Sequence, residues 1–147
     1  MRSVGSRRTR HPRRRDLGRL MEGRALVEGR ATGPALVLEE PLSFWGELDP
    51  ATGEIVEANH PQRNSIVAGT ILVMPSGRGS SSSATVLAEA IRAGTTPAGI
   101  VLGEPDGIIV IGALVAAELY GVTIPVVVAS AAGYAAIRDG EQISLVP

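Results

Sequence analysis

The segment that decides the fold is ILVM at residues 71–74, followed by PSGRGSSSS at residues 75–83. The four apolar residues predict a buried strand, and the apolar positions between 86 and 91 predict one face of a helix. A strand, glycine turn and helix in this order direct backbone N–H groups and the positive end of the helix dipole at one point. Arg78 adds a cation with a planar fork of donors. The sequence therefore predicts an anion site here, with Ser80 in the position of a reactive oxygen.

Strands and helices are predicted to alternate on both sides of this segment. Before it, we expect two short strands at 24–29 and 35–38, with a turn at Thr32-Gly33-Pro34 between them, and a long loop at 41–65 containing a short strand at 54–57. After it, we expect a helix of about 12 residues ending near Gly94, a strand at 98–102, a buried helix at 107–120 ending at Gly121, a strand within 122–129, a helical turn at 134–138 and a last strand at 141–146. Apolar strands joined by helices predict parallel crossovers and an α/β fold.

Composition limits the possible functions. The chain has 147 residues, which fits one domain with a core built from aliphatic residues, since aromatic residues make up only 3%. It has no cysteine, so this chain alone cannot hold an iron–sulfur cluster, a zinc–thiolate site or a disulfide. With only His11 and His60 as imidazole ligands, we expect no metal site in the chain. No apolar run is long enough to span a membrane and no signal peptide is visible, so a cytoplasmic protein is expected.

The charges are unevenly distributed along the chain. All 14 basic residues are arginine, and eight of them fall in the first 19 residues beside a single acid, Asp16. We therefore divide the chain into a basic, disordered arm at 1–20 and one domain at 21–147. Either the arm binds nucleic acid or directs transport, or an upstream start codon produces it and Met21 is the natural first residue. The acidic body argues against nucleic acid as a partner of the domain.

From Pro41 onward the chain resembles the small subunit, or swivel domain, of the aconitase X family. The resemblance rests on PLSFWG at 41–46, DPATGEI at 49–55, His60-Pro61 and PSGRGSSS at 75–82, with support from GALVAAELYG at 112–121 and PVVV at 125–128. It implies a swivelling β/β/α domain like the mobile domain of aconitase, with a β-rich N-terminal part. One departure is that Glu47 follows Gly46, where family members commonly have a second glycine. Glu47 puts a negative charge near the predicted anion site and so bears on the substrate.

The resemblance also implies a function. Family members are hydro-lyases in which a large subunit carries an iron–sulfur cluster and most of the substrate contacts, so no cofactor is expected on this chain. The known activities are dehydration of phosphomevalonate and of cis-3-hydroxy-L-proline. The serine run and the AAELYG helix favour the hydroxyproline type or a similar small hydroxy acid, with phosphomevalonate as the alternative.

Carried over by motif, the family's serine base corresponds to Ser80, and its alkoxide would be stabilised by N–H groups at the helix start and by Arg78. The expected substrate-binding residues are those of the turn and the serine run: Gly77, Arg78, Gly79, Ser81 and Ser82. The expected partner-interface or loop residues belong to the upstream segment: Ser43, Phe44, Trp45, Gly46 and His60.

Simpler interpretations of these residues remain open on the sequence. Ser80 or a neighbouring serine could cap the helix, and Arg78 could pair with an acid at the surface. Phe44 and Trp45 could pack under the loop or face a partner, while His60 fits a turn or an interface better than a catalytic acid. At the level of the whole chain, the alternatives are a phosphotransfer-type swivel domain, which would need a histidine that the turn lacks, and a non-enzymatic anion-binding module.

Overall fold

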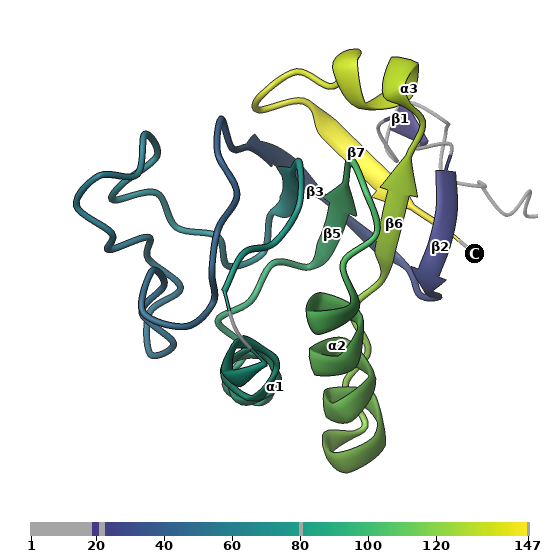
Figure 1. The fold of residues 1–147 in the computed structure, drawn as a ribbon. Coiled ribbons are helices and arrows are strands. Elements are labelled where there is room, and N and C mark those ends of the chain that lie inside the picture. The colour runs from purple at the N-terminus through teal and green to yellow at the C-terminus, as the bar shows by residue number, and fades with distance from the viewer. Residues whose placement is uncertain (1–18, 21–22, 80, 147) are drawn as a thin grey trace, which may run out of the picture.

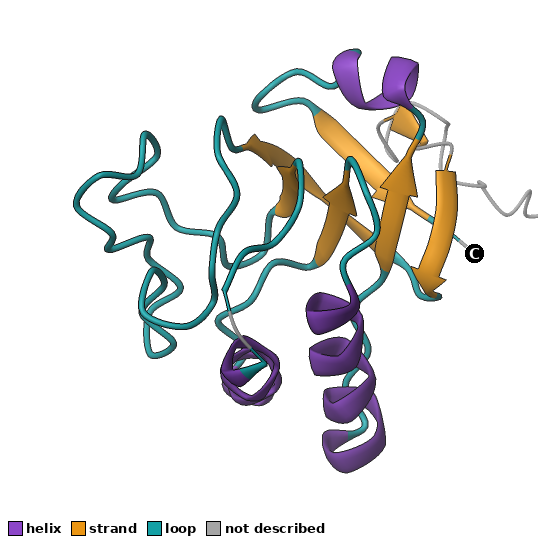
Figure 2. Cartoon of the chain, in the orientation of Figure 1, coloured by secondary structure: helices purple, strands orange, loops and turns teal. Residues whose placement is uncertain are grey.

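The computed structural model describes residues 19–20, 23–79 and 81–146, in which one mixed sheet of seven strands carries three helices (Figure 1). The strands are β1 (Arg19–Leu20), β2 (Gly23–Val27), β3 (Ala31–Val37), β4 (Ile71–Met74), β5 (Gly99–Leu102), β6 (Val126–Ala129) and β7 (Gln142–Leu145), in the sheet order β1-β7-β3-β4-β5-β6-β2. The helices are α1 (Ser82–Ala93), α2 (Gly107–Tyr120) and α3 (Ala131–Ala135). Figure 2 shows α1 and α2 next to each other on one side of the sheet, with α3 at the opposite end.

The central strands confirm the predicted parallel crossovers. β4 pairs in parallel with β5, and β5 with β6, and each pair is connected through a helix, α1 or α2. Side chains alternate along β4, so Leu72 and Met74 belong to the apolar cluster under α1 and α2, whereas Ile71 and Val73 belong to a second cluster on the other face. The sheet is therefore buried on both faces, and the carboxyl ends of β4, β5 and β6 open at the same edge.

Both long helices form where the sequence predicts them. α1 ends at Gly94 and α2 at Gly121, each in the left-handed conformation that glycine adopts easily. The expectation that the second helix is buried is wrong for one of its faces. Ile109, Ala113 and Ala116 are buried against the core, but Ile111 and Leu119 are exposed. The helix is apolar on both faces, and within the described residues only one of them is covered.

The turn predicted at Thr32-Gly33-Pro34 is wrong, because these residues lie inside β3. The first part of β3 pairs antiparallel with β7, and the part from Ala35 pairs in parallel with β4. Gly33 serves close packing, since a Cβ there would lie 2.7 Å from the carbonyl oxygen of Gly69. The Ala35 N–H donates to the Glu141 carbonyl on the β7 side of the strand, so the nitrogen of the preceding residue, Pro34, faces the β4 side. β4 pairs with β3 only from Ala35 onward, so no carbonyl of β4 awaits a donor at Pro34. Proline therefore costs no ladder hydrogen bond there.

The long loop predicted at 41–65 lies at one end of the sheet (Figure 1). The strand predicted at 54–57 is reduced to two isolated bridges, between Leu48 and Ile55 and between Glu54 and Ile66. The loop nevertheless has its own apolar anchors, since Leu42, Phe44, Leu48, Ile55 and Val67 are buried in the core cluster. It is therefore fixed against the domain by packing.

The sheet is curled, as the position of its first two strands shows. β1 pairs with β7 at one end of the strand order and β2 pairs with β6 at the other end. Three Cα–Cα steps separate Leu20 from Gly23, and these can span at most about 11 Å. The two ends of the sheet therefore approach each other.

Most of the predicted basic arm lies outside the described residues. Its last two residues, Arg19 and Leu20, form β1 and pair in register with Ile143 and Ser144 of β7. Among the residues that the structure describes, no helix combines the length and apolar character needed to cross a membrane.

Candidate functional site

The glycine-containing turn at residues 75–79 leaves the carboxyl end of β4 and runs beside the long loop. Gly77 forms a parallel bridge with Leu42, and the Arg78 N–H donates to the Leu42 carbonyl oxygen at 3.3 Å. The structure thus brings the turn together with the SFWGE segment at 43–47. Ser80 lies outside the described residues, so its role as a base stays a prediction.

Two glycines allow this close packing. Gly79 has φ +110, and a Cβ there would lie 2.6 Å from the Ser43 hydroxyl and 2.8 Å from the Ser83 hydroxyl. At Gly77 a Cβ would lie 2.9 Å from a carboxylate oxygen of Asp106. Since real Cβ atoms do not approach other heavy atoms this closely, a side chain at either position would force its neighbours to move, and at Gly79 the positive φ adds backbone strain. The two expected substrate-binding glycines therefore also have a packing role.

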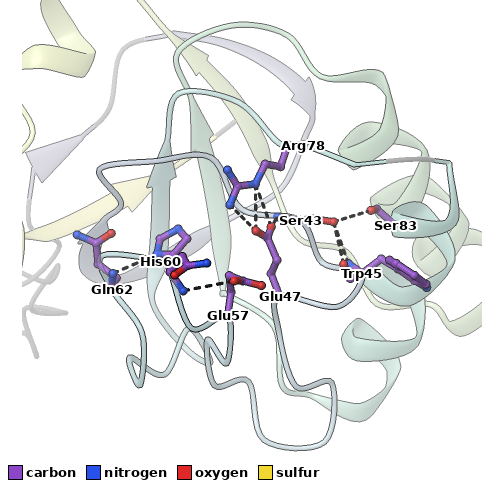
Figure 3. A network of polar contacts seen from close by, with 9 residues as sticks. Ser43, Trp45, Glu47, Glu57, His60, Gln62, Arg78 and Ser83 are labelled. Atoms are coloured by element: carbon purple, nitrogen blue, oxygen red, sulfur yellow. Dashed lines mark hydrogen bonds and ion pairs between the residues drawn. The ribbon is translucent and has the colours of Figure 1, made fainter.

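Two buried serines connect the loop to helix α1. The Ser43 and Ser83 hydroxyls are 3.1 Å apart and hydrogen-bonded, and the residues are 6% and 3% exposed. Ser43 also closes a tight turn through Trp45, whose N–H donates to the Ser43 hydroxyl at 3.2 Å (Figure 3). Ser43, predicted as a loop or interface residue, therefore lies beneath the site.

Arg78 forms an ion pair with Glu47. The guanidinium donates through Nη2 to one carboxylate oxygen, and through Nε to both oxygens at 3.0 and 3.1 Å; the Ser43 N–H donates to the same carboxylate (Figure 3). Partial burial acts to raise the pKa of Glu47, but the hydrogen bonds from Arg78 and Ser43 and the charges of Arg78 and His60 outweigh it and lower that pKa. The Arg78 pKa is raised, mainly by its hydrogen bonds with Glu47. Of the two interpretations of Arg78, pairing with an acid is the one observed.

The start of α1 carries the rest of the serine run. Ser81 occupies the N-cap position with a helical backbone conformation, and its side chain makes no capping hydrogen bond. Ser81 and Ser82 are exposed, while the Ser83 hydroxyl bonds to Ser43. Neither the Ser81 nor the Ser83 side chain therefore caps α1, as the simpler interpretation of the serine run had proposed.

A small hollow lies between the turn, the loop and the two long helices. Its polar lining comes from Arg78, Ser83 and Asp106, and its apolar lining includes Phe44 and Ile109. Its cavity volume is about 10 Å³, which is room for about one water molecule and far below the roughly 300–1,000 Å³ of ordinary ligand pockets. This hollow is therefore too small to hold a substrate by itself.

The predicted loop residues divide into buried and exposed groups. Phe44 is buried in the core, whereas Trp45 is 60% exposed beyond it, and Gly46 has φ +84 with open space around it. His60 is buried and its Nδ1 accepts the Gln62 N–H at 3.1 Å, which fits the expected turn. Its Nε2 has no hydrogen-bond partner among the described residues.

Sequence reasoning missed Asp106 as a neighbour of the turn. One carboxylate oxygen of Asp106 accepts the N–H groups of Ile108 and Ile109 at 3.0 and 3.1 Å, which caps α2. The pattern of Asp before an apolar helical run is an N-cap signal, but no sequence feature connects it to Gly77. Within the described ranges, no three His, Asp or Glu residues form a group that could hold a metal ion.

Comparison with known sequences agrees with the resemblance noted above. Residues 20–147 match the model of the aconitase X swivel domain. The chain is 43% identical over 107 residues to a cis-3-hydroxy-L-proline dehydratase of Pseudomonas aeruginosa, and the match covers 73% of this chain but 18% of that protein. It is 30% identical over 126 residues to the phosphomevalonate dehydratase small subunit of Methanosarcina acetivorans, covering 85% and 83% of the two chains. The chain thus spans about a fifth of the hydroxyproline dehydratases that it matches.

The fold also matches a solved structure. The crystal structure of holo aconitase X from Thermococcus kodakaraensis superposes with a TM-score of 0.73 at 32% identity, covering 84% of this chain and 88% of the other. The predicted α/β swivel-domain fold is thereby confirmed. On the match over residues 20–147 together with this likeness, the chain belongs to the aconitase X swivel domain family.

Proposed function

We propose that this chain is the swivel subunit of an aconitase X-type dehydratase that removes water from a small hydroxy acid after assembly with a large subunit. The observation that carries the proposal is the turn at 75–79, which presents Arg78 and the start of α1 beside a hollow that is too small for a substrate. A site of this kind needs a second wall. Relatives named as small subunits imply that a large subunit supplies it.

The proposed reaction is an elimination. A base removes a proton from the carbon next to the substrate carboxylate, hydroxide leaves from the neighbouring carbon, and a double bond forms with release of water. We assign the base to Ser80, which follows Gly79 directly in the chain. A serine oxygen becomes basic enough only where N–H dipoles or cations stabilise its alkoxide and water is excluded. Because Glu47 balances the charge of Arg78, we assign this stabilisation mainly to the N–H groups of the turn and helix start.

The chain does not fit an iron–sulfur cluster of its own, since it contains no cysteine. We propose that any cluster belongs to the large subunit. The part of this chain is then to position Ser80, to bind the substrate through Ser81 and Ser82, and to close the site against water.

An exposed apolar face on α2 supports a partner. Ile111, Leu114, Val115 and Leu119 project from this helix, and Leu119 is 67% exposed. With Ala84 and Ala88 of α1, three of them (Ile111, Val115 and Leu119) line a groove, one end of which is formed by Ser81 of the serine run. Because Ser81 belongs both to this groove and to the serine run, a subunit that closes the site would also cover this face. We therefore assign the groove to the large subunit.

We favour cis-3-hydroxy-L-proline or a similar hydroxy acid as the substrate. The support is the 43% identity to the Pseudomonas aeruginosa dehydratase, against 36% to the phosphomevalonate dehydratase small subunit of Methanocella arvoryzae. The phosphomevalonate reaction is the alternative, and here the matched small subunit has a length similar to that of this chain.

The test is to coexpress the chain with a large aconitase X subunit from the same genome and to assay the purified assembly on both substrates. We expect dehydration by the assembly and none by the chain alone. Ser80→Ala should abolish turnover while leaving assembly intact. The control is Thr123→Ala, which removes an exposed hydroxyl in the loop after α2 and should leave turnover unchanged. Assembly without activity on any hydroxy acid would contradict the proposed function, and turnover by Ser80→Ala would remove the base assignment.

A further inference from the structure

We propose that Glu47 is a specificity-determining residue whose carboxylate occupies the anion position beside Arg78 and selects against phosphorylated substrates. The inference rests on the proposed function, because it concerns the substrate class of the same site. Glu47 lies outside the serine run, and its carboxylate decides between the two candidate substrates.

The Glu47 carboxylate is bound as a foreign anion would be. Arg78 approaches it side-on, with Nη2 donating to one oxygen and Nε donating to the other at 3.1 Å. This two-bond geometry is the one by which arginine binds substrate carboxylates and phosphates. The Ser43 N–H adds a backbone donor to the same group. The donors at this point of the site are therefore already engaged by the chain's own anion.

The arrangement keeps the carboxylate charged and in place. The Glu47 side chain is 13% exposed, and the donors around it lower its pKa despite the burial. Gly46, in the left-handed conformation, directs the chain into this position, and the Ser43–Ser83 hydrogen bond fixes the segment against α1. A substrate anion would therefore have to displace the Glu47 carboxylate, which the chain itself holds within hydrogen-bonding distance of Arg78.

Among the described residues, the charges that act on the Arg78–Glu47 pair include more carboxylates than cations, and the cations are Arg78 itself and the buried His60. Besides Glu47, the carboxylates of Glu40 and Glu57 are close enough to act on Arg78 and raise its pKa. The chain contains no lysine. A phosphate dianion at the turn would thus meet three carboxylates and one guanidinium that is already paired, whereas a hydroxy acid with a single carboxylate brings less charge into this field. The charge balance favours the substrate without a phosphate.

The first test measures anion binding without turnover. The full chain is titrated with inorganic phosphate while the Arg78 Nε–H signal is followed by ¹⁵N NMR, in the wild type, Glu47→Gln and Glu57→Gln. Glutamine keeps the size of the side chain and removes its charge. Glu57→Gln is the matched control, because Glu57 lies in the same loop and acts on Arg78, while its carboxylate accepts a hydrogen bond from the Asn59 N–H.

We expect phosphate to bind Glu47→Gln about tenfold more tightly than the wild type, and its affinity for Glu57→Gln to change little. The expected factor is modest because the Arg78 guanidinium is partly exposed. Equal phosphate affinity in the wild type and Glu47→Gln would overturn the proposal. An equal gain in both variants would also overturn it, since general charge rather than contact with Arg78 would then be responsible.

The second test uses the assembled enzyme. Glu47→Gln should raise the ratio of kcat/KM for phosphomevalonate to kcat/KM for cis-3-hydroxy-L-proline about tenfold, mainly through KM for the phosphorylated substrate. A ratio that stays within about twofold of the wild-type value would contradict the assignment. If the wild-type assembly acts on neither substrate, the proposed function fails, and the phosphate titration still decides the role of Glu47.

Discussion

The hydroxyls of Ser43 and Ser83 lie 3.1 Å apart in the interior and form a side-chain hydrogen bond that joins the long loop to the first turn of α1. Through it, the segment that carries Glu47 and the helix that follows the serine run form one unit. The geometry of the candidate site therefore depends on a contact between two residues that are 40 positions apart.

This serine pair can be tested by a double-mutant cycle. Ser43→Ala and Ser83→Ala should each cost about 1–2 kcal/mol of unfolding free energy, because each leaves the other buried hydroxyl with one partner fewer. The double variant should cost less than the sum of the two, with a coupling of about 0.5–1 kcal/mol. Urea unfolding of the four proteins measures this. Additive losses would show that the two hydroxyls do not stabilise each other.

Gly79→Ala should destabilise the domain more than Gly46→Ala. Both glycines have positive φ, so both substitutions introduce backbone strain of about 1 kcal/mol or more. Only at Gly79 does the new Cβ also collide with Ser43 and Ser83, since Gly46 has open space around it. We expect the loss at Gly79 to be larger by at least about 1 kcal/mol, measured by thermal and urea unfolding. Equal losses would mean that the turn can move away from the serines.

Stability should depend on pH through Glu47. Since folding lowers the Glu47 pKa below its usual value of 4.5, the carboxylate stabilises the folded state fully above about that pH, and the contribution is lost as the pH falls through the folded-state pKa. The unfolding free energy of the wild type should exceed that of Glu47→Gln by about 1 kcal/mol near neutral pH. We expect no more than this because Arg78 is partly exposed and solvent weakens the ion pair. The difference should shrink steadily in acid. Urea unfolding across an acidic pH series checks this, and a difference that persists unchanged at the acid end would exclude the ion pair as its source.

Leu119→Glu should weaken assembly with the large subunit about tenfold or more, because it places a charge on the apolar face of α2, at its most exposed residue. The stability of the isolated chain should change little, since the side chain is largely exposed. Val146→Glu is the control, as Val146 is an exposed apolar residue next to β7, away from α2. Titration calorimetry with the purified large subunit gives both affinities. Equal weakening by both variants would show that charge rather than location is responsible.

Local sequence signals predicted the helices well and the sheet less well. The helix at 107–120 has its predicted bounds, because Asp106 and Gly121 provide a cap at each end. β3 was divided by a predicted turn, because its first half is held by β7, more than 100 positions further along the chain. A Gly-Pro pair reads as a turn in isolation, and only the distant partner strand makes it extended.

The site shows the same division between local and distant information. The turn at 75–79 and the proximity of Glu47 to it follow from the sequence and its family resemblance. The direct Arg78–Glu47 pair, the burial of Phe44 beneath Trp45 and the approach of Asp106 to Gly77 depend on how the long loop packs. No local pattern encodes that packing, because the apolar anchors of the loop keep no regular helical or strand spacing from one end of the loop to the other.

The nearness of β1 and β2 has a consequence for how other molecules can attach. An open sheet offers unpaired peptide groups along its outer strands, and these can recruit a strand from another molecule. In this domain the polypeptide runs from one outer strand to the other over two intervening residues, and the outer strand β1 pairs with β7 over two residues only. An outer strand this short offers few peptide groups to a strand from another molecule, which disfavours strand addition at the β1 end of the sheet.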